Sequence, residues 1–199
     1  MRKFVLAAGA AALVLAGCAS VKDTERSTGA GSKPSPIEAG KAAGAAAGYL
    51  WSQRMEDEKR QMQAATQGTG VMVSQTPANE LKLVIPSDVS FEVGRAVIQP
   101  EFAPVLDRFA AGLRNDPMVE IRIIGHTDST GTDAINLPLS SQRAAAARDD
   151  LVARGVPAGA IRIEGRGARE PIADNATAAG RAQNRRVEIY VGERPPTSP

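Results

Sequence analysis

The stretch from residue 121 to residue 143 constrains the fold more than any other part of the chain. Ile121 and Ile123 alternate with an arginine, and another isoleucine closes the run before Gly125, which predicts a buried strand. A polar loop follows, and we expect a helix to begin at about residue 141 with Ser140 as its N-cap. A buried strand that leads through a loop into a helix is typical of layered folds containing both element types.

Two charged side chains flank this predicted loop. Asp128 follows the end of the strand, and Arg143 falls in the first turn of the predicted helix. A carboxylate accepts hydrogen bonds from an ammonium group, and a guanidinium holds a carboxylate, so this pair suits a ligand with both groups, such as an amino acid. The alternative is that Asp128 caps a turn and that Arg143 is solvated. The spacing by itself leaves both interpretations open.

Hydrophobic periodicity elsewhere completes the predicted domain. Leu81, Leu83 and Ile85 alternate with other residues as in a strand, and apolar residues from Phe102 to Leu113 recur at helical spacing. Further strands are predicted at 71–75, 160–164 and 186–191, and a second long helix at 141–154. The order β-β-α-β-α-β-β over residues 70–193 predicts an α+β fold, a two-layer α/β sandwich with its helices on one face of a small sheet.

Composition argues against several classes of function. The net charge of +2 over 199 residues is too small to indicate nucleic-acid binding. The chain has one cysteine and one histidine, too few for the Cys and His ligands of a structural zinc site. We therefore expect no nucleic-acid partner, no metal site and no cofactor.

The N-terminus has the pattern of a bacterial export signal. Residues 1–17 combine a basic start with an apolar segment too short to span a bilayer. Leu-Ala-Gly-Cys at 15–18 resembles the lipobox of bacterial lipoproteins, in which the signal is cleaved before a cysteine that carries acyl chains such as palmitate. This resemblance makes Cys18 the predicted lipidation site, and Ala19 after it favours the outer membrane. The alternative is an ordinary signal peptide followed by a free cysteine.

Two further segments are predicted before the domain. Residues 18–37, rich in Ser, Thr, Gly, Lys and Pro, should form a flexible linker with a reach of roughly 60 Å. Residues 38–67 should form a Gly/Ala-rich helix in which Gly40, Gly44 and Gly48 lie on one face. Small residues at this spacing favour close helix packing, hence a homo-oligomer, although docking at the lipid interface or a weakly stable stalk are alternatives. Residues 194–199 are predicted to be a disordered tail.

Several separated motifs together resemble the OmpA C-terminal domain family, which includes the peptidoglycan-associated lipoproteins. The resemblance covers roughly residues 80–192. The motifs are Gly125-His126-Thr127-Asp128 with Gly131, then Asn136-x-x-Leu139-Ser140-x-x-Arg143-Ala144, then Pro171 with Asn175-x-Thr177, and finally Gly180-Arg181-x-x-Asn184-Arg185-Arg186-Val187. Their order along the chain makes the match specific, while Pro138 departs from the family pattern.

The resemblance implies non-covalent binding of peptidoglycan through the diaminopimelate of its stem peptide. In this family Asp128 and Arg143 would hold the amino acid, with Asn136 supporting the loop or touching the ligand. Arg185 and Arg186 would line the site, unless one of them is a structural partner of Asp128. The single histidine, His126, would pack the loop and is not expected to act as a catalyst.

The sequence thus predicts a lipid-anchored protein on the periplasmic face of the outer membrane of a Gram-negative bacterium, tethering that membrane to the cell wall. We expect no enzymatic activity. Two alternatives remain. The first is a peptidoglycan hydrolase, which needs two opposed carboxylates such as Asp128 and Asp133. The second is an envelope adaptor that works mainly through protein partners.

Overall fold

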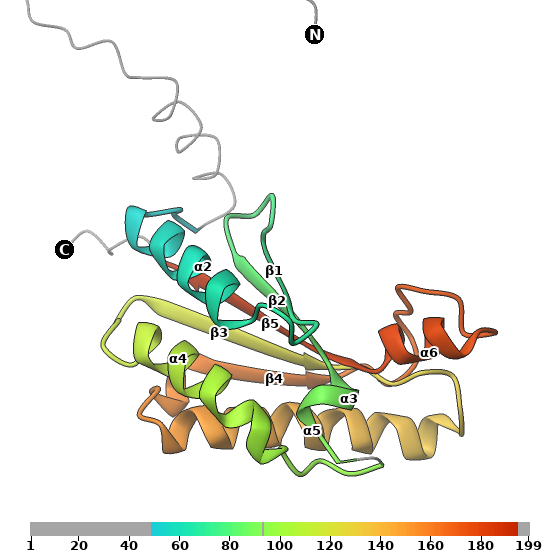
Figure 1. Cartoon of the computed structure of the whole chain (residues 1–199). Coiled ribbons are helices and arrows are strands. Elements are labelled where there is room, and N and C mark those ends of the chain that lie inside the picture. Colours follow the sequence, from blue (N-terminus) through green and yellow to red (C-terminus); the bar gives the residue numbers. More distant parts are fainter. Residues whose placement is uncertain (1–48, 93, 195–199) are drawn as a thin grey trace, which may run out of the picture. The chain divides into compact units, whose positions relative to one another are not determined.

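A computed structural model describes residues 49–92 and 94–194 (Figure 1). The strands are β1 (Met72–Gln75), β2 (Leu81–Pro86), β3 (Val119–Gly125), β4 (Ile161–Gly165) and β5 (Arg186–Glu193). The helices are α2 (Gln53–Ala65), α3 (Ser87–Ser90), α4 (Ala103–Leu113), α5 (Asp133–Ala153) and α6 (Ala178–Asn184), with 3-10 turns at Pro100–Phe102 and Ala158–Ala160. The predictions for the export signal, Cys18, the linker and the glycines at 40–48 concern residues outside the described ranges, as do those for 195–199.

The strands form one five-stranded sheet in the order β1-β2-β5-β3-β4. Neighbours are antiparallel except β3 and β4, which are parallel and joined through α5, because parallel strands need a crossover connection. In β2, Leu81, Leu83 and Ile85 are at most 3% exposed, and they share a core with the inward residues of β3 and β5 and with α4 and α5. The predicted α+β sandwich and its order of strands and long helices are therefore confirmed.

Helix α5 begins earlier than the sequence predicted. It starts at Asp133, so Ser140 lies inside the helix and the prediction of an N-cap there is wrong. Pro138 explains the error, because a proline lacks the backbone donor of a helix interior and disfavours helical geometry in the residue before it. Here it lies close to the helix start, and Ala134, four residues earlier, is exposed, so that its carbonyl can bond to water instead of to a backbone donor at 138. Arg143 consequently lies in the middle of α5.

Helix α2 is shorter than predicted and packs into the domain. Residues 49–52 are not helical, because Leu50 forms a β-bridge with Glu193 and Ser52 caps the helix by accepting a hydrogen bond from Met55 N at 3.2 Å. Met55 and Met62 are both 0% exposed and belong to the same core as the sheet. A helix that the sequence placed outside the domain thus shares its core. No helix in the described part of the chain is long and apolar enough to cross a membrane.

Two short helices were not predicted. Helix α3 follows β2 directly, and α6 lies just before β5, where Thr177 caps it by accepting a hydrogen bond from Gly180 N at 2.9 Å. A side chain at Gly180 would collide with the Asp174 carbonyl, since its Cβ would lie 1.9 Å from that oxygen. Helices this short give no periodic hydrophobic pattern by which a sequence could predict them.

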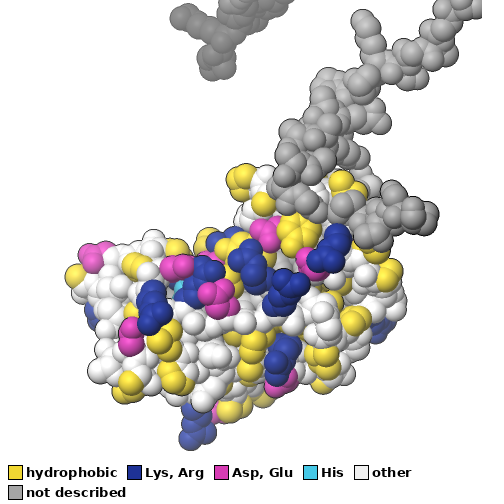
Figure 2. Space-filling model, turned by 180° about the vertical axis from the view of Figure 1, so that it is seen from behind, with side chains coloured by type: hydrophobic (Ala, Val, Ile, Leu, Met, Phe, Trp, Pro, Cys, Tyr) yellow, Lys and Arg dark blue, Asp and Glu magenta, His cyan; other side chains and the backbone are white. Residues whose placement is uncertain are grey.

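The other face of the sheet carries charged side chains. Residues directly opposite one another across β2, β5, β3 and β4 form a row of Lys82, Tyr190, Arg122 and Arg162. Carboxylates flank this row, with Lys82 paired to Glu188 at 3.2 Å and Arg122 to Glu80 at 3.2 Å. Figure 2, which views the molecule from behind, shows Lys and Arg side chains interleaved with Asp and Glu. The sheet therefore has one apolar face and one charged face.

We predict that α2 unfolds together with the sheet. Met62→Ala removes a fully buried side chain between α2 and the rest of the core, and it should lower the free energy of unfolding by about 2–5 kcal/mol. Gln61→Ala, at the neighbouring exposed position, is the matched control and should change it by less than about 0.5 kcal/mol. Urea unfolding followed by circular dichroism measures both, and equal effects would show that α2 is not part of the cooperative unit.

Candidate functional site

The loop after β3 is held by hydrogen bonds to two other segments. His126 N donates to Arg186 O, and Thr127 N donates to Gly167 O, both at 2.9 Å. Within the loop, the Asp128 carboxylate accepts from Thr130 N at 2.8 Å, as Asp often does in turns. Asn136 lies in the first turns of α5, and its Nδ2 donates to Thr130 O at 3.0 Å and to Asp128 O at 3.4 Å. Asn136 therefore supports the loop, one of the two roles the sequence suggested.

Helix α5 lies very close to the ends of β3 and β4. Gly125 and Gly165 are paired across these strands. A Cβ at Gly125 would lie 2.0 Å from Ser140 O, and one at Gly165 would lie 2.5 Å from Ser141 N. Ser140 is 0% exposed, and its Oγ donates to Leu137 O and accepts from Gly167 N, each at 2.9 Å. This packing fixes α5 relative to the loop that carries Asp128.

Arg143 projects from α5 into a buried environment. The residue is 4% exposed, its Nε donates to Arg95 O at 3.0 Å, and its guanidinium lies 5.6 Å from the centroid of the Phe91 ring. No ion pair joins it to a carboxylate in the described part of the chain. Burial lowers the pKa of Arg143 and the charge of Arg185 adds to this, while Asp88 and Asp128 oppose it. An anion placed beside Arg143 would therefore be strongly favoured.

Arg185 links two carboxylates at the end of α6. Its Nη1 lies 2.7 Å from Asp128 Oδ2, and its Nε and Nη2 lie 3.0 and 2.7 Å from the two oxygens of Asp88. Burial raises the pKa of Asp128, but hydrogen bonds from Arg185 and Thr130 outweigh it, so the net pKa is below its usual range. Asp128 is therefore ionised at neutral pH, and Arg185 is its structural partner.

A hollow of about 190 Å³, open to solvent, lies beside these groups. It is lined by Ser87, Asp88, Phe91, Glu92, Gly94, Arg143 and Arg185. The sequence analysis did not identify Asp88, because it lies in the four-residue helix α3, which is too short to give a periodic pattern. Asp128 does not line this hollow itself but pairs with Arg185, which does. No cluster of three or more His, Cys, Asp or Glu side chains able to hold a metal occurs among the described residues.

Arg186 lies apart from the hollow. It is 2% exposed, and its guanidinium bonds to Glu188 Oε1 at 2.8 Å, to Asn184 O at 3.3 Å and to Glu170 O at 3.2 Å. Successive residues of a strand point to opposite faces, so the alternation of β5 puts Arg186 on the charged face of the sheet together with Glu188. The structure thus brings Asp128, Arg143 and Arg185 together and separates Arg186 from them.

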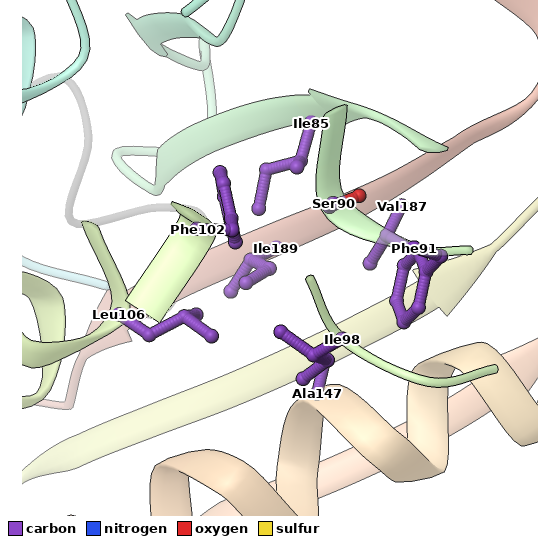
Figure 3. Close-up of a pocket in the computed structure, with 9 residues that line it drawn as sticks. All are labelled: Ile85, Ser90, Phe91, Ile98, Phe102, Leu106, Ala147, Val187 and Ile189. Atoms are coloured by element: carbon purple, nitrogen blue, oxygen red, sulfur yellow. The ribbon is translucent and has the colours of Figure 1, made fainter. Parts of the chain in front are cut away.

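A second hollow lies inside the core (Figure 3). Its free volume is only about 10 Å³, barely enough for one water, and it is lined by Ile85, Ser90, Phe91, Ile98, Phe102, Leu106, Ala147, Val187 and Ile189. Ser90 contributes the polar side chain, and its Oγ donates to Pro86 O at 2.9 Å. Such an apolar lining is unsuited to a charged ligand, because desolvating a charge without a partner is costly. The charged hollow around Arg143 is therefore the candidate site.

Comparison with known proteins identifies the family. A family model described as "OmpA family" matches residues 90–185. The solved structure of the cell wall anchor of the T6SS from Pseudomonas aeruginosa is similar over 68% of this chain and 96% of that chain, with 34% sequence identity and a TM-score of 0.61. The chain belongs to the OmpA family. The family model covers β3, α5 and the loop between them, which carry Asp128 and Arg143.

Two further relatives extend this comparison. The probable lipoprotein YiaD of Escherichia coli (strain K12) is 40% identical over 135 residues, which are 68% of this chain and 61% of YiaD. The peptidoglycan-binding protein ArfA of Mycobacterium bovis is 44% identical over 111 residues, 56% of this chain and 34% of ArfA. The chain thus spans less than two thirds of either relative.

His126 occupies the opposite side of the loop from the hollow. Its ring is 1% exposed, neither nitrogen has a hydrogen-bond partner among the described residues, and Nε2 lies 3.9 Å from Glu188 Oε2. Burial, reinforced by the charge of Arg186, lowers its pKa from 6.5 to about 4. His126 is therefore neutral at pH 7, which fits the packing role that the sequence suggested.

We predict that His126 makes stability depend on pH. Between pH 6.5 and about 4 the unfolded chain binds a proton at His126 that the native protein does not bind. Unfolding should therefore become easier as the pH falls through this window, with a full effect of about 3 kcal/mol. His126→Gln should remove this contribution.

Urea unfolding of both proteins between about pH 7.5 and 4 measures the difference. Glu188, whose pKa is lowered from 4.5 to about 2, contributes in the same direction but only at the acidic end. If the two proteins lose stability in parallel above pH 5, then His126 is protonated as readily in the native state as in the unfolded chain.

Proposed function

We propose that this protein is a lipid-anchored outer-membrane protein that binds peptidoglycan non-covalently through diaminopimelate and thereby tethers the membrane to the cell wall. Membership of the OmpA family supports this proposal, as does similarity to a relative named as peptidoglycan-binding and to another named as a probable lipoprotein. The chain spans less than two thirds of each of these relatives. The chemistry of the site is therefore the main support for the proposal.

The single observation that carries the proposal is the environment of Arg143. Its guanidinium is buried without a carboxylate partner, yet it lines a hollow that is open to solvent. A buried cation of this kind is stabilised by a ligand carboxylate, ideally in a two-pronged pair. Diaminopimelate carries an ammonium beside each free carboxylate, and Asp128 is the ionised group suited to accept it. The ligand would then pair with opposite charges at both groups.

The other predicted site residues take distinct roles in this proposal. Asn136 holds the loop through its bonds to Asp128 O and Thr130 O and so acts on the site indirectly. Arg185 borders the ligand, since it lines the hollow and pairs with Asp128. Arg186 contributes by holding the start of β5 through Glu188 and Glu170.

Binding is a better match to this geometry than hydrolysis. A glycosidase needs two carboxylates that face one bond from opposite sides, one of them able to give up a proton. Asp133 instead pairs with Arg169 at 3.1 Å, and its side chain is 62% exposed. Asp128 is held ionised by Arg185. Asp128 is therefore not in the state of a general acid, and the non-enzymatic character of the family agrees with this.

We predict that the two charged groups of the site are each required for peptidoglycan binding. Asp128→Asn keeps the side-chain size, and Arg143→Gln keeps a polar but shorter side chain. Each variant leaves one end of the ligand without its opposite charge. Such losses typically cost about 2–5 kcal/mol, or roughly thirty- to several-thousand-fold in affinity. Both variants should therefore fail to co-sediment with purified peptidoglycan while circular dichroism shows them to be folded.

The matched controls lie further along the same helix. Arg148→Gln and Asp149→Asn change exposed residues of α5 that pair with each other at 2.7 Å. These variants should pellet with peptidoglycan as the unaltered protein does. Folded Asp128→Asn and Arg143→Gln proteins that still pellet would place the ligand elsewhere.

We also predict that Cys18 is acylated. The Leu-Ala-Gly-Cys sequence at 15–18 motivates this expectation, and several acyl chains would anchor the protein firmly because a single chain binds membranes only marginally. Cys18→Ala should block maturation and remove the protein from the outer-membrane fraction, measured by fractionation and by mass spectrometry of the mature N-terminus. Normal processing and membrane association of this variant would rule out the lipid anchor.

A further inference from the structure

The position proposed for the ligand ammonium is already occupied. Arg185 Nη1 lies 2.7 Å from Asp128 Oδ2, and Thr130 N donates to the other oxygen at 2.8 Å. Both carboxylate oxygens of Asp128 thus already accept a hydrogen bond, its side chain is only 10% exposed, and it does not line the solvent-open hollow. A ligand ammonium must therefore compete with Arg185 for the Asp128 carboxylate.

Arg185 has a second carboxylate available. Asp88, on helix α3, binds it in a two-pronged pair through Nε at 3.0 Å and Nη2 at 2.7 Å. The backbone supports this arrangement, because Ser87 N donates to Arg185 O at 2.8 Å. Asp88 lines the hollow and its side chain is 51% exposed. Arg185 can therefore remain paired through Asp88 after it leaves Asp128.

The charges around the hollow favour such an exchange. Glu92 also lines the hollow but pairs with Arg95 at 3.1 Å. Among the other charged groups, Arg143 has no anion of its own, while Arg185 is shared by Asp88 and Asp128. A bound ligand with one carboxylate and one ammonium would give each cation and each anion a partner of its own: ligand carboxylate with Arg143, ligand ammonium with Asp128, and Arg185 with Asp88. Without Asp88, the displaced Arg185 would be left unpaired.

We propose that Asp88 is a positioning residue of this site, which holds Arg185 so that the ammonium of an amino-acid ligand can replace it on Asp128. This inference rests on the proposed binding of diaminopimelate and adds to it a residue that selects for the ammonium group. A ligand that has the carboxylates but no amine leaves Arg185 on Asp128 and has no need of Asp88. Asp88 therefore discriminates between diaminopimelate and its deaminated analogue, pimelate.

The test is a set of titrations of the full-length protein in detergent with diaminopimelate and with pimelate, followed by NMR chemical shifts. Asp88→Asn should weaken diaminopimelate binding roughly three- to tenfold, the range expected for losing a partly exposed ion pair. The same variant should leave pimelate binding unchanged, and Asp88→Glu should restore part of the loss. The matched control is Asp107→Asn, an exposed carboxylate paired with Arg154 on another surface, which should titrate normally with both ligands.

A double-mutant cycle separates the exchange from a structural role. Arg185→Gln removes the competitor and should tighten diaminopimelate binding, roughly three- to tenfold. In the Asp88→Asn/Arg185→Gln protein the affinity lost through Asp88→Asn should be recovered. The reason is that Arg185, the cation that Asp88 holds away from Asp128, is then absent. A double variant that binds no better than Asp88→Asn alone, or an Arg185→Gln variant that binds more weakly, would overturn the inference and make Arg185 a direct ligand contact.

The two levels of the proposal fail in different ways. If the unaltered protein binds diaminopimelate and the Asp128→Asn and Arg143→Gln variants do not, the proposed site is supported. The Asp88 and Arg185 variants alone then test the exchange. If the unaltered protein does not bind diaminopimelate, or if those two variants bind it normally, then the proposed site and the exchange both fall.

Discussion

The contact of α5 with the ends of β3 and β4 is the constraint on which the rest of the site depends. Two glycines paired across these strands, Gly125 and Gly165, let the helix backbone at Ser140 approach to a distance that no side chain would allow. Ser140 then ties the helix to the segment after β4 through Gly167. Because Asp128 is carried by the loop after β3 and Arg143 by the helix, this packing sets the distance between the two charges.

Burial gives the site its chemical character. An exposed arginine would be solvated and would gain little from a ligand, whereas Arg143 is surrounded by a backbone carbonyl and an aromatic ring and lacks a carboxylate of its own among the described residues. The opposite holds for Asp128, whose charge is already matched by Arg185. The site therefore combines one cation that needs an anion with one anion whose partner is held by a second carboxylate, Asp88.

The sheet separates this site from a second charged region. Its inward face is packed with aliphatic side chains and with the two methionines of α2, while its outward face carries paired lysine, arginine and glutamate side chains. His126 and Arg186 belong to the outward side, although they are neighbours in sequence of residues that form the ligand site. Adjacent residues at the end of one strand thus serve two different environments, since successive side chains point to opposite faces.

The strands, the two long helices and the family could be predicted from the sequence, because alternation, helical periodicity and motif order are local properties of the chain. The sequence also indicated Asp128 and Arg143. The start of α5 before Pro138, the packing of α2 into the core and the sharing of Arg185 between Asp88 and Asp128 are seen only in the folded protein. Asp88 and Arg185 are 97 positions apart. Contacts between segments so distant leave no periodic signal in one sequence, so folding alone brings such charges together.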